Sequence, residues 1–307
     1  FHYLFGDGDV RISIAVMFAT LVGIVLLLNI FIENGRTIFD RFIAYIFLTG
    51  ALFFATSWVM SYFILVQTTE IPTWPLMLLG SYVAIRRKNS KAGLIIPGMM
   101  FGLAVCMRPN QIIGHVVLLL ALSLIIDFGV APVKKLIHLT QRFVAMGVVS
   151  ALPLIHNLYF GNQFVVFSTS RAGGSFDLSA APDHILRYLY VYTRPLRSGD
   201  LTSQGIMGLP GNGYSKSIWI AMVVFLFIWI ISVVQTVRVR NIWKFMFAIL
   251  VPISYVLPII PYHAYFPRHA VVFWLSLLVV SVAVKDSSNS KFGSEEKAFS
   301  NNSITHF

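Results

Sequence analysis

Charged residues are scarce in this sequence, and that scarcity excludes most soluble folds. Asp, Glu, Lys and Arg make up 11% of the 307 residues, whereas hydrophobic residues make up 57%. A water-soluble chain carries about a quarter charged residues. Together with a mean hydropathy of +0.78, this composition indicates a membrane protein.

Cysteine is almost absent, and the common catalytic motifs are missing. Cys106 is the only cysteine, which excludes an internal disulfide and a cysteine-based metal site. There is no Walker-type glycine-rich loop, HExxH or CxxC motif, so we do not expect ATP-driven transport within this chain. The histidines show no ligand spacing, and we interpret His115 and His156 as hydrogen-bonded bundle residues rather than ligands.

Apolar stretches recur along the whole chain and predict an all-α, polytopic membrane helix bundle. We expect residues 1–284 to form this bundle, with one long outer loop at 161–217 that contains a short amphipathic helix at 183–192. We expect residues 285–307 to form a disordered cytoplasmic tail. About nine transmembrane helices are predicted, at 12–32, 42–66, 71–85, 92–107, 111–126, 143–160, 218–234, 245–260 and 269–284.

The distribution of Lys and Arg predicts how the bundle is oriented. If the first residues lie outside, the inside segments carry 15 Lys and Arg, against three in the short outer segments. This asymmetry favours a multi-pass membrane protein with the N-terminus outside and the C-terminus inside. It also accounts for the net charge of +11, so we expect no nucleic-acid partner. An outside N-terminus without a signal peptide further predicts that residues precede Phe1.

Three charged residues on the predicted outer rim are candidate site residues, because charges against a membrane are costly. Glu70 is a candidate base or metal ligand, or else a helix-start glutamate favoured by the helix dipole. Arg108 lies in a short turn between two spans, where its planar fork can hold a phosphate or reach lipid headgroups. Arg268 precedes the last span, where Tyr265 and His269 either line a polar pocket or form an aromatic belt.

The long outer loop adds a basic group that either contacts substrate or is solvated loop charge. This group consists of Arg171, Arg187, Arg194 and Arg197. One carboxylate and several arginines on the same rim suit an anionic substrate that contains phosphate.

Two of these stretches resemble GT-C superfamily membrane glycosyltransferases. The first is Thr69-Glu70-Ile71-Pro72, followed by an apolar run and a basic loop. The second is Gly98 to Asn110, with the pattern G-x-x-x-G-L-A-x-x-x-R-P. The bacterial protein-mannosyltransferase-like and lipid-A aminoarabinose-transferase-like branches are the most similar, which implies a bacterial inner membrane. The Arg-containing stretch 265–269 is similar to an element that closes the core of these enzymes.

The resemblance implies that sugar passes from a polyprenyl-phosphate-linked donor to a lipid, glycan or protein acceptor on the outer face. It assigns the donor phosphate to Arg108 and Arg268, and a supporting or metal-linked role to Glu70. The family's main catalytic base corresponds to residues before Phe1, so neither Asp7 nor Asp9 is equated with it, and we expect this chain alone to be inactive. A divalent metal is compatible with the site, and no other cofactor is implied.

Two other functions remain open from the sequence. An O-antigen-ligase-like or polymerase-like enzyme would also use a large outer loop with arginines. A transporter of lipid-linked sugars would instead require charged or broken helices near the middle of the membrane, and internal repeats.

The charge asymmetry predicts which residues a membrane-impermeant thiol reagent reaches in intact cells. Cysteines introduced near Lys88, Lys135 and Val239 should stay unlabelled, whereas those near Glu70, Tyr190 and Tyr265 should be labelled. Labelling at position 88 but not at 190 would contradict the predicted orientation.

Overall fold

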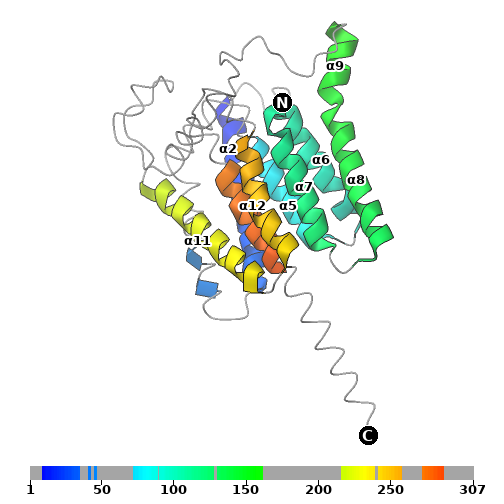
Figure 1. Cartoon of the computed structure of the whole chain (residues 1–307). Coiled ribbons are helices and arrows are strands. Elements are labelled where there is room, and N and C mark those ends of the chain that lie inside the picture. Colours follow the sequence, from blue (N-terminus) through cyan, green and yellow to red (C-terminus); the bar gives the residue numbers. More distant parts are fainter. Residues whose placement is uncertain are drawn as a thin grey trace, which may run out of the picture.

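The computed structural model describes residues 9–34, 41–42, 45–46, 72–88, 90–127, 130–161, 216–238, 241–257 and 272–286, and the regular structure in them is helical (Figure 1). Three of these helices are long and apolar enough to cross a membrane, at Ala15–Glu33, Pro109–Ile126 and Pro132–Gly161. The elements in chain order are α2 (Asp9–Glu33), α5 (Thr73–Arg86), α6 (Lys91–Met107), the short 3-10 helix η1 (Pro109–Gln111), α7 (Ile112–Ile126), α8 (Pro132–Ser150), α9 (Leu152–Gly161), α11 (Lys216–Arg238) and α12 (Ile242–Val256), followed by a helical segment at 272–286.

The predicted all-α class is confirmed for the described residues, and helices lie at eight of the nine predicted spans. The remaining span, 42–66, falls almost entirely outside them, so the number of membrane crossings stays a prediction. Most of the predicted outer loop and tail also falls outside. Lys285 and Asp286, which we assigned to the tail, belong to the last helical segment.

One predicted boundary is wrong. Residues 127–142 were expected to form an inside loop, but α8 begins at Pro132 and continues through the predicted span at 143–160 into α9. Pro132 occupies the first turn of α8, where a missing N–H costs nothing.

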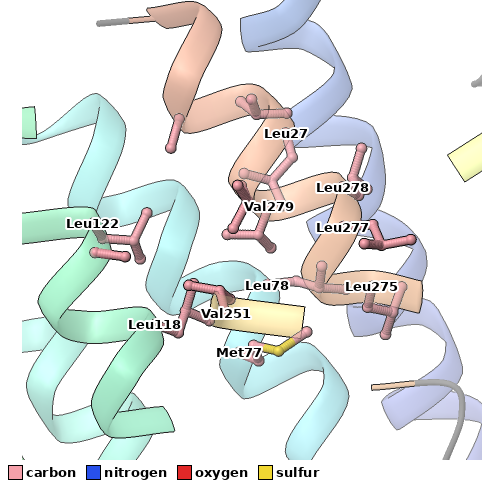
Figure 2. Packing of buried hydrophobic residues seen from close by; sticks show 14 of the residues in the cluster. Leu27, Met77, Leu78, Leu118, Leu122, Val251, Leu275, Leu277, Leu278 and Val279 are labelled. Carbon is pink, nitrogen blue, oxygen red and sulfur yellow. The ribbon is translucent and has the colours of Figure 1, made fainter. Parts of the chain in front are cut away.

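The core is apolar and lies around the helical segment 272–286. Leucine and methionine side chains from α2, α5 and α7 meet Leu275, Leu277 and Leu278 of that segment (Figure 2). Every residue from Trp274 to Lys285 is buried, so protein rather than lipid surrounds this segment. In a membrane such packing is stabilised by van der Waals contact, because lipid chains are as apolar as the side chains.

Ion pairs join three helices at one end of the bundle. Arg86 of α5 pairs with Glu33 of α2 at 2.8 Å. Asp286 lies 3.7 Å from Lys88 and accepts a 3.0 Å hydrogen bond from Asn34. We call this the basic end, because it carries Arg86, Arg87, Lys88, Lys91, Lys134, Lys135, Arg238, Lys244 and Lys285. The opposite end, where α6 meets α7, is called the Arg108 end.

Glycines allow α6 and α8 to approach closely. A Cβ atom placed on Gly102 would lie 2.7 Å from the carbonyl oxygen of Met146 and 2.8 Å from Cβ of Val149. A Cβ atom on Gly98 would collide with the carbonyl oxygen of Arg142. The Gly98-x-x-x-Gly102 pattern is therefore a helix-packing face of the kind that small residues form in membranes.

Three prolines interrupt the backbone hydrogen bonding of these helices, and each freed carbonyl has a donor from a neighbouring helix. A proline at position i cannot donate to the carbonyl of residue i−4. Pro97 frees the carbonyl of Gly93, and Pro252 frees that of Ala248. Arg142 Nε donates to Gly93 at 3.3 Å, and Trp229 Nε1 donates to Ala248 at 2.7 Å.

The third proline lies where α8 passes into α9. Pro153 frees the carbonyl of Val149, which accepts a 3.1 Å hydrogen bond from Cys106 Sγ. Helices α6 and α8 thus exchange donors in both directions, Arg142 to α6 and Cys106 to α8, on either side of the glycine contact.

This account predicts that Trp229 stabilises the protein only while Pro252 is present. Trp229→Phe should lower the free energy of unfolding by about 1 kcal/mol, because it leaves the Ala248 carbonyl without a donor. In a Pro252→Ala background the helix supplies its own N–H to Ala248, so the same change should cost much less. Unfolding midpoints in detergent or lipid would measure both costs, and equal costs would refute this explanation.

Candidate functional site

Of the predicted site residues, Arg108 is the one that the described residues include. Glu70, Arg171, Arg187, Arg194, Arg197, Tyr265, Arg268 and His269 lie outside them, and so does the predicted helix at 183–192. The site is therefore built outward from Arg108.

The backbone of Arg108 is fixed by hydrogen bonds on both sides. Its N–H donates to the carbonyl of Ala104 in the last turn of α6 at 2.9 Å, and its carbonyl accepts from the N–H of Gln111 at 3.0 Å. Its φ and ψ of −140° and 80° end α6 and turn the chain into η1. The residue is half-buried. Arg108 is thus held in a tight turn at the end of the bundle.

Polar side chains from α5, α7 and α12 are buried next to this turn. Thr73 Oγ1 donates to Gln111 Oε1 at 3.4 Å, which joins α5 to η1 at the start of α7. The hydroxyl of Tyr255 in α12 and Nδ1 of His115 are 3.0 Å apart. We call Thr73, Arg108, Gln111, His115 and Tyr255 the Arg108 cluster.

His115 and His156, the two histidines in the predicted apolar spans, differ in burial. His115 is buried and hydrogen-bonded inside the bundle, which confirms its interpretation. The same interpretation of His156 is wrong, because His156 is exposed on α9 and contacts Phe160, with 4.9 Å between ring centroids. Helix α9 has no buried residue.

Two helices present their N-terminal ends at the Arg108 cluster. Helix α5 begins at Thr73, and α7 follows the turn after Arg108. The N-terminal end of a helix carries partial positive charge on its unbonded N–H groups and favours anions. Among the described residues, His115 Nε2 and Trp74 Nε1 are buried without a hydrogen-bond partner. The Arg108 cluster and the adjacent Trp74 together therefore combine a guanidinium, two helix N-terminal ends and two buried ring nitrogens.

Helix α9 continues beyond the level of Arg108. The bond between Cys106 and Val149 places the end of α6 beside the end of α8. From there α9 runs on to Gly161, which at 1.5 Å per residue is about 15 Å. Figure 1 shows α9 rising past the ends of the neighbouring helices, and its apolar side chains, including Tyr159 and Phe160, are exposed. Such a surface suits contact with lipid.

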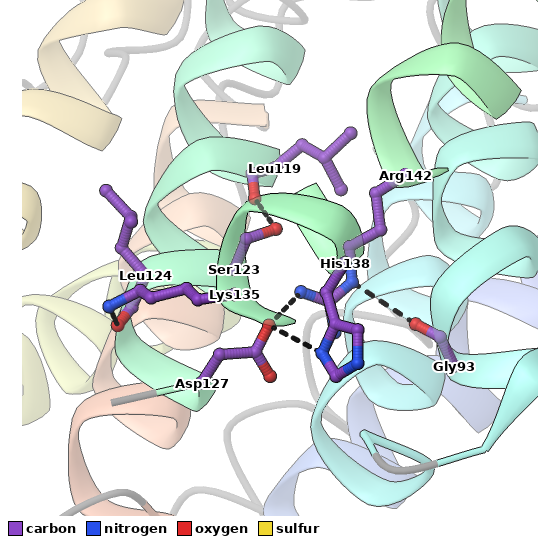
Figure 3. Close-up of polar contacts among 8 residues, drawn as sticks. All are labelled: Gly93, Leu119, Ser123, Leu124, Asp127, Lys135, His138 and Arg142. Carbon is purple, nitrogen blue, oxygen red and sulfur yellow. Dashed lines mark hydrogen bonds and ion pairs between the residues drawn. The ribbon is translucent and has the colours of Figure 1, made fainter. Parts of the chain in front are cut away.

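A second buried polar cluster lies at the basic end (Figure 3). Asp127 Oδ2 at the end of α7 is 2.8 Å from Arg142 Nη1 and 3.4 Å from His138 Nδ1. All three side chains are buried. Lys135, on the same helix as His138 and Arg142, donates to the carbonyl of Leu124 in the last turn of α7 at 3.3 Å. This cluster joins α8 to α7, and through Arg142 to the carbonyl of Gly93 in α6.

The sequence-based prediction missed the Asp127 pairing because it placed Asp127 and Arg142 at the two ends of an inside loop, 127–142, between the spans 111–126 and 143–160. One signal was available. His138 and Arg142 are four residues apart and therefore lie on the same face of a helix, and Asp127 was the first acidic residue after Glu70.

Among the described residues, no group of three His, Cys, Asp or Glu side chains is arranged to hold a metal ion. Comparison of the chain with protein-family models, curated proteins and solved structures finds no match.

Two of the ion pairs at the basic end, one buried and one exposed, should contribute differently to the free energy of unfolding. Asp127→Ala should lower the free energy of unfolding by about 3–5 kcal/mol, because it leaves the guanidinium of Arg142 buried without its carboxylate. Glu33→Ala, at the exposed pair with Arg86, should cost about 1 kcal/mol or less. Unfolding midpoints would test this difference, and equal costs would contradict a structural role for the buried pair.

Proposed function

We propose that this chain is a multi-pass membrane glycosyltransferase that moves a sugar from a polyprenyl-phosphate-linked donor to an acceptor at the Arg108 end. The observation that carries the proposal is the Arg108 cluster, in which a fixed arginine stands beside the positive ends of two helices. Polar groups are costly inside a membrane protein, and they mark functional sites more often than not.

The reaction requires stabilisation of a leaving phosphate. As the bond between sugar and phosphate breaks, negative charge develops on the polyprenyl phosphate. Arg108 is suited to this charge because its guanidinium can make two parallel hydrogen bonds to phosphate oxygens. The N-terminal ends of α5 at Thr73 and of the continuous helix η1–α7 at Pro109 add fixed positive charge that needs no rearrangement during the reaction.

The acceptor hydroxyl also needs a base. Glu70 precedes Thr73 by three residues in the sequence and remains the candidate for a supporting carboxylate. The resemblance also leads us to propose that Arg268 holds the donor phosphate. We propose that the arginines of the loop 161–217 contact substrate and that a divalent metal can bind at the site.

The proposal also includes the orientation of the bundle in the membrane. Positive charge in short segments favours the cytoplasmic side, and the basic end collects most of the described Lys and Arg residues. The Arg108 end then faces outward, where a polyprenyl-linked donor and an extracytoplasmic acceptor would meet. The apolar surface of α8 and α9 would face lipid.

Replacement of Arg108 tests the proposed function. In the full-length protein, Arg108→Ala should lower the transfer rate about a hundredfold or more, which corresponds to about 3 kcal/mol of transition-state stabilisation. Arg108→Lys should be intermediate, because an ammonium reproduces the charge without the planar fork.

The assay is sugar transfer from a polyprenyl-phosphate-linked donor in proteoliposomes, expressed per folded molecule. Arg87→Ala is a matched control, since Arg87 is an exposed arginine at the opposite end of the bundle. Normal rates for both Arg108 variants would remove Arg108 from the site.

A further inference from the structure

Two buried contacts connect the Arg108 turn to α12 and α5. We infer that His115 and Tyr255 are positioning residues, which set the place of the Arg108 guanidinium relative to the donor phosphate. This inference rests on the proposed function.

The contact with α12 is buried and closely packed. The Tyr255 side chain is 2% exposed and that of His115 is fully buried. Their rings meet edge to face at 5.4 Å between centroids, while Phe101 of α6 stacks on the imidazole at 5.8 Å. The imidazole is thus fixed by α6 and α12 together, and the hydroxyl of Tyr255 fixes its rotation.

Gly114 brings the Tyr255 ring against the backbone of α7. A Cβ atom at Gly114 would collide with the ring, so the tyrosine lies directly on the first turn of α7. That turn is continuous with η1 and Arg108 through the bond from Gln111 N–H to the Arg108 carbonyl. A displacement of the Tyr255 ring would therefore also displace the first turn of α7 and, with it, the Arg108 backbone.

The contact with α5 sets the spacing between the Arg108 turn and the N-terminal end of α5. Thr73 is the first residue of α5, and its hydroxyl donates to Gln111. A phosphate shared by the Arg108 guanidinium and the N-terminal end of α5 requires a fixed spacing between these two groups. Misplacement of a catalytic group by about 1 Å can cost a hundredfold in rate.

The test is a double-mutant cycle in the full-length protein. If Tyr255 acts through Arg108, Tyr255→Phe should lower kcat/KM for the donor about tenfold in the presence of Arg108 and less than twofold in an Arg108→Ala background. A general loss of stability would reduce activity equally in both backgrounds, which would overturn the inference.

A second pair of variants covers the case in which Tyr255→Phe fails to fold. His115→Asn keeps a hydrogen-bonding atom near the position of Nδ1 and should retain most of the activity, whereas His115→Leu should lose about tenfold. Equal activities for the Asn and Leu variants would overturn the inference. Trp229→Phe, which removes a hydrogen bond to α12 away from the Arg108 cluster, is the stability control and should leave kcat/KM unchanged per folded molecule.

The two hypotheses fail in different ways. If Arg108→Ala itself has normal kcat/KM, the proposed function of the site is wrong. If Arg108→Ala is impaired but Tyr255→Phe and His115→Leu are normal, the site stands and the positioning role is wrong.

Discussion

Carbonyl groups that prolines leave without a helical partner constrain how these helices pack. In hydrocarbon there is no water to bond such a group, so a carbonyl without a donor destabilises the folded bundle. The carbonyls of Gly93, Val149 and Ala248 each accept a hydrogen bond from the side chain of an adjacent helix. The prolines therefore do not simply weaken their helices, because each creates an acceptor that a neighbour can satisfy in only one register.

Helices α6 and α8 show the consequence most clearly. Arg142 bonds to α6 near the basic end, Cys106 bonds to α8 near the other end, and Gly98 and Gly102 bring the backbones together between them. Because Cys106 lies two residues before Arg108, the same register that satisfies the Val149 carbonyl also sets the height of Arg108 beside α8. The contacts that pack α6 against α8 therefore also position the candidate site.

The sequence predicted the helices well, because hydropathy is a local property and most spans are flanked by charged or turn-forming residues. It failed where a charge lies inside a helix. Arg142 was taken for a loop residue, although it is buried three turns into α8 against Asp127. The pairing of Arg142 with Gly93 depends on which helix lies beside α8, and no periodicity in one sequence specifies that neighbour. His156 shows the reverse error, since its apolar surroundings reflect an exposed helix rather than the interior.

For the candidate site, the sequence could identify Arg108 as a charge in a turn between two spans. It could not show that Gln111 and His115 meet α5 and α12, because those contacts join residues 38 and 140 positions apart. Residues of this kind are found only after the helices have been placed relative to one another.

The distribution of polar groups along the bundle separates a one-sided site from a path through the membrane. Gln111 of η1 and His115 of α7 lie near one end of the continuous helix 109–126, and Asp127 follows its other end, with the apolar run 116–122 between them. In the buried segment 272–286 the hydroxyls of Ser276 and Ser281 donate to carbonyls of their own helix, so their hydrogens are not available to a passing solute. A transporter of charged, lipid-linked sugars needs polar groups at mid-membrane. Across the part of the chain that the structure describes, the charged side chains lie toward the two ends of the bundle with an apolar core between them, and this arrangement supports the proposed one-sided site rather than the transporter alternative.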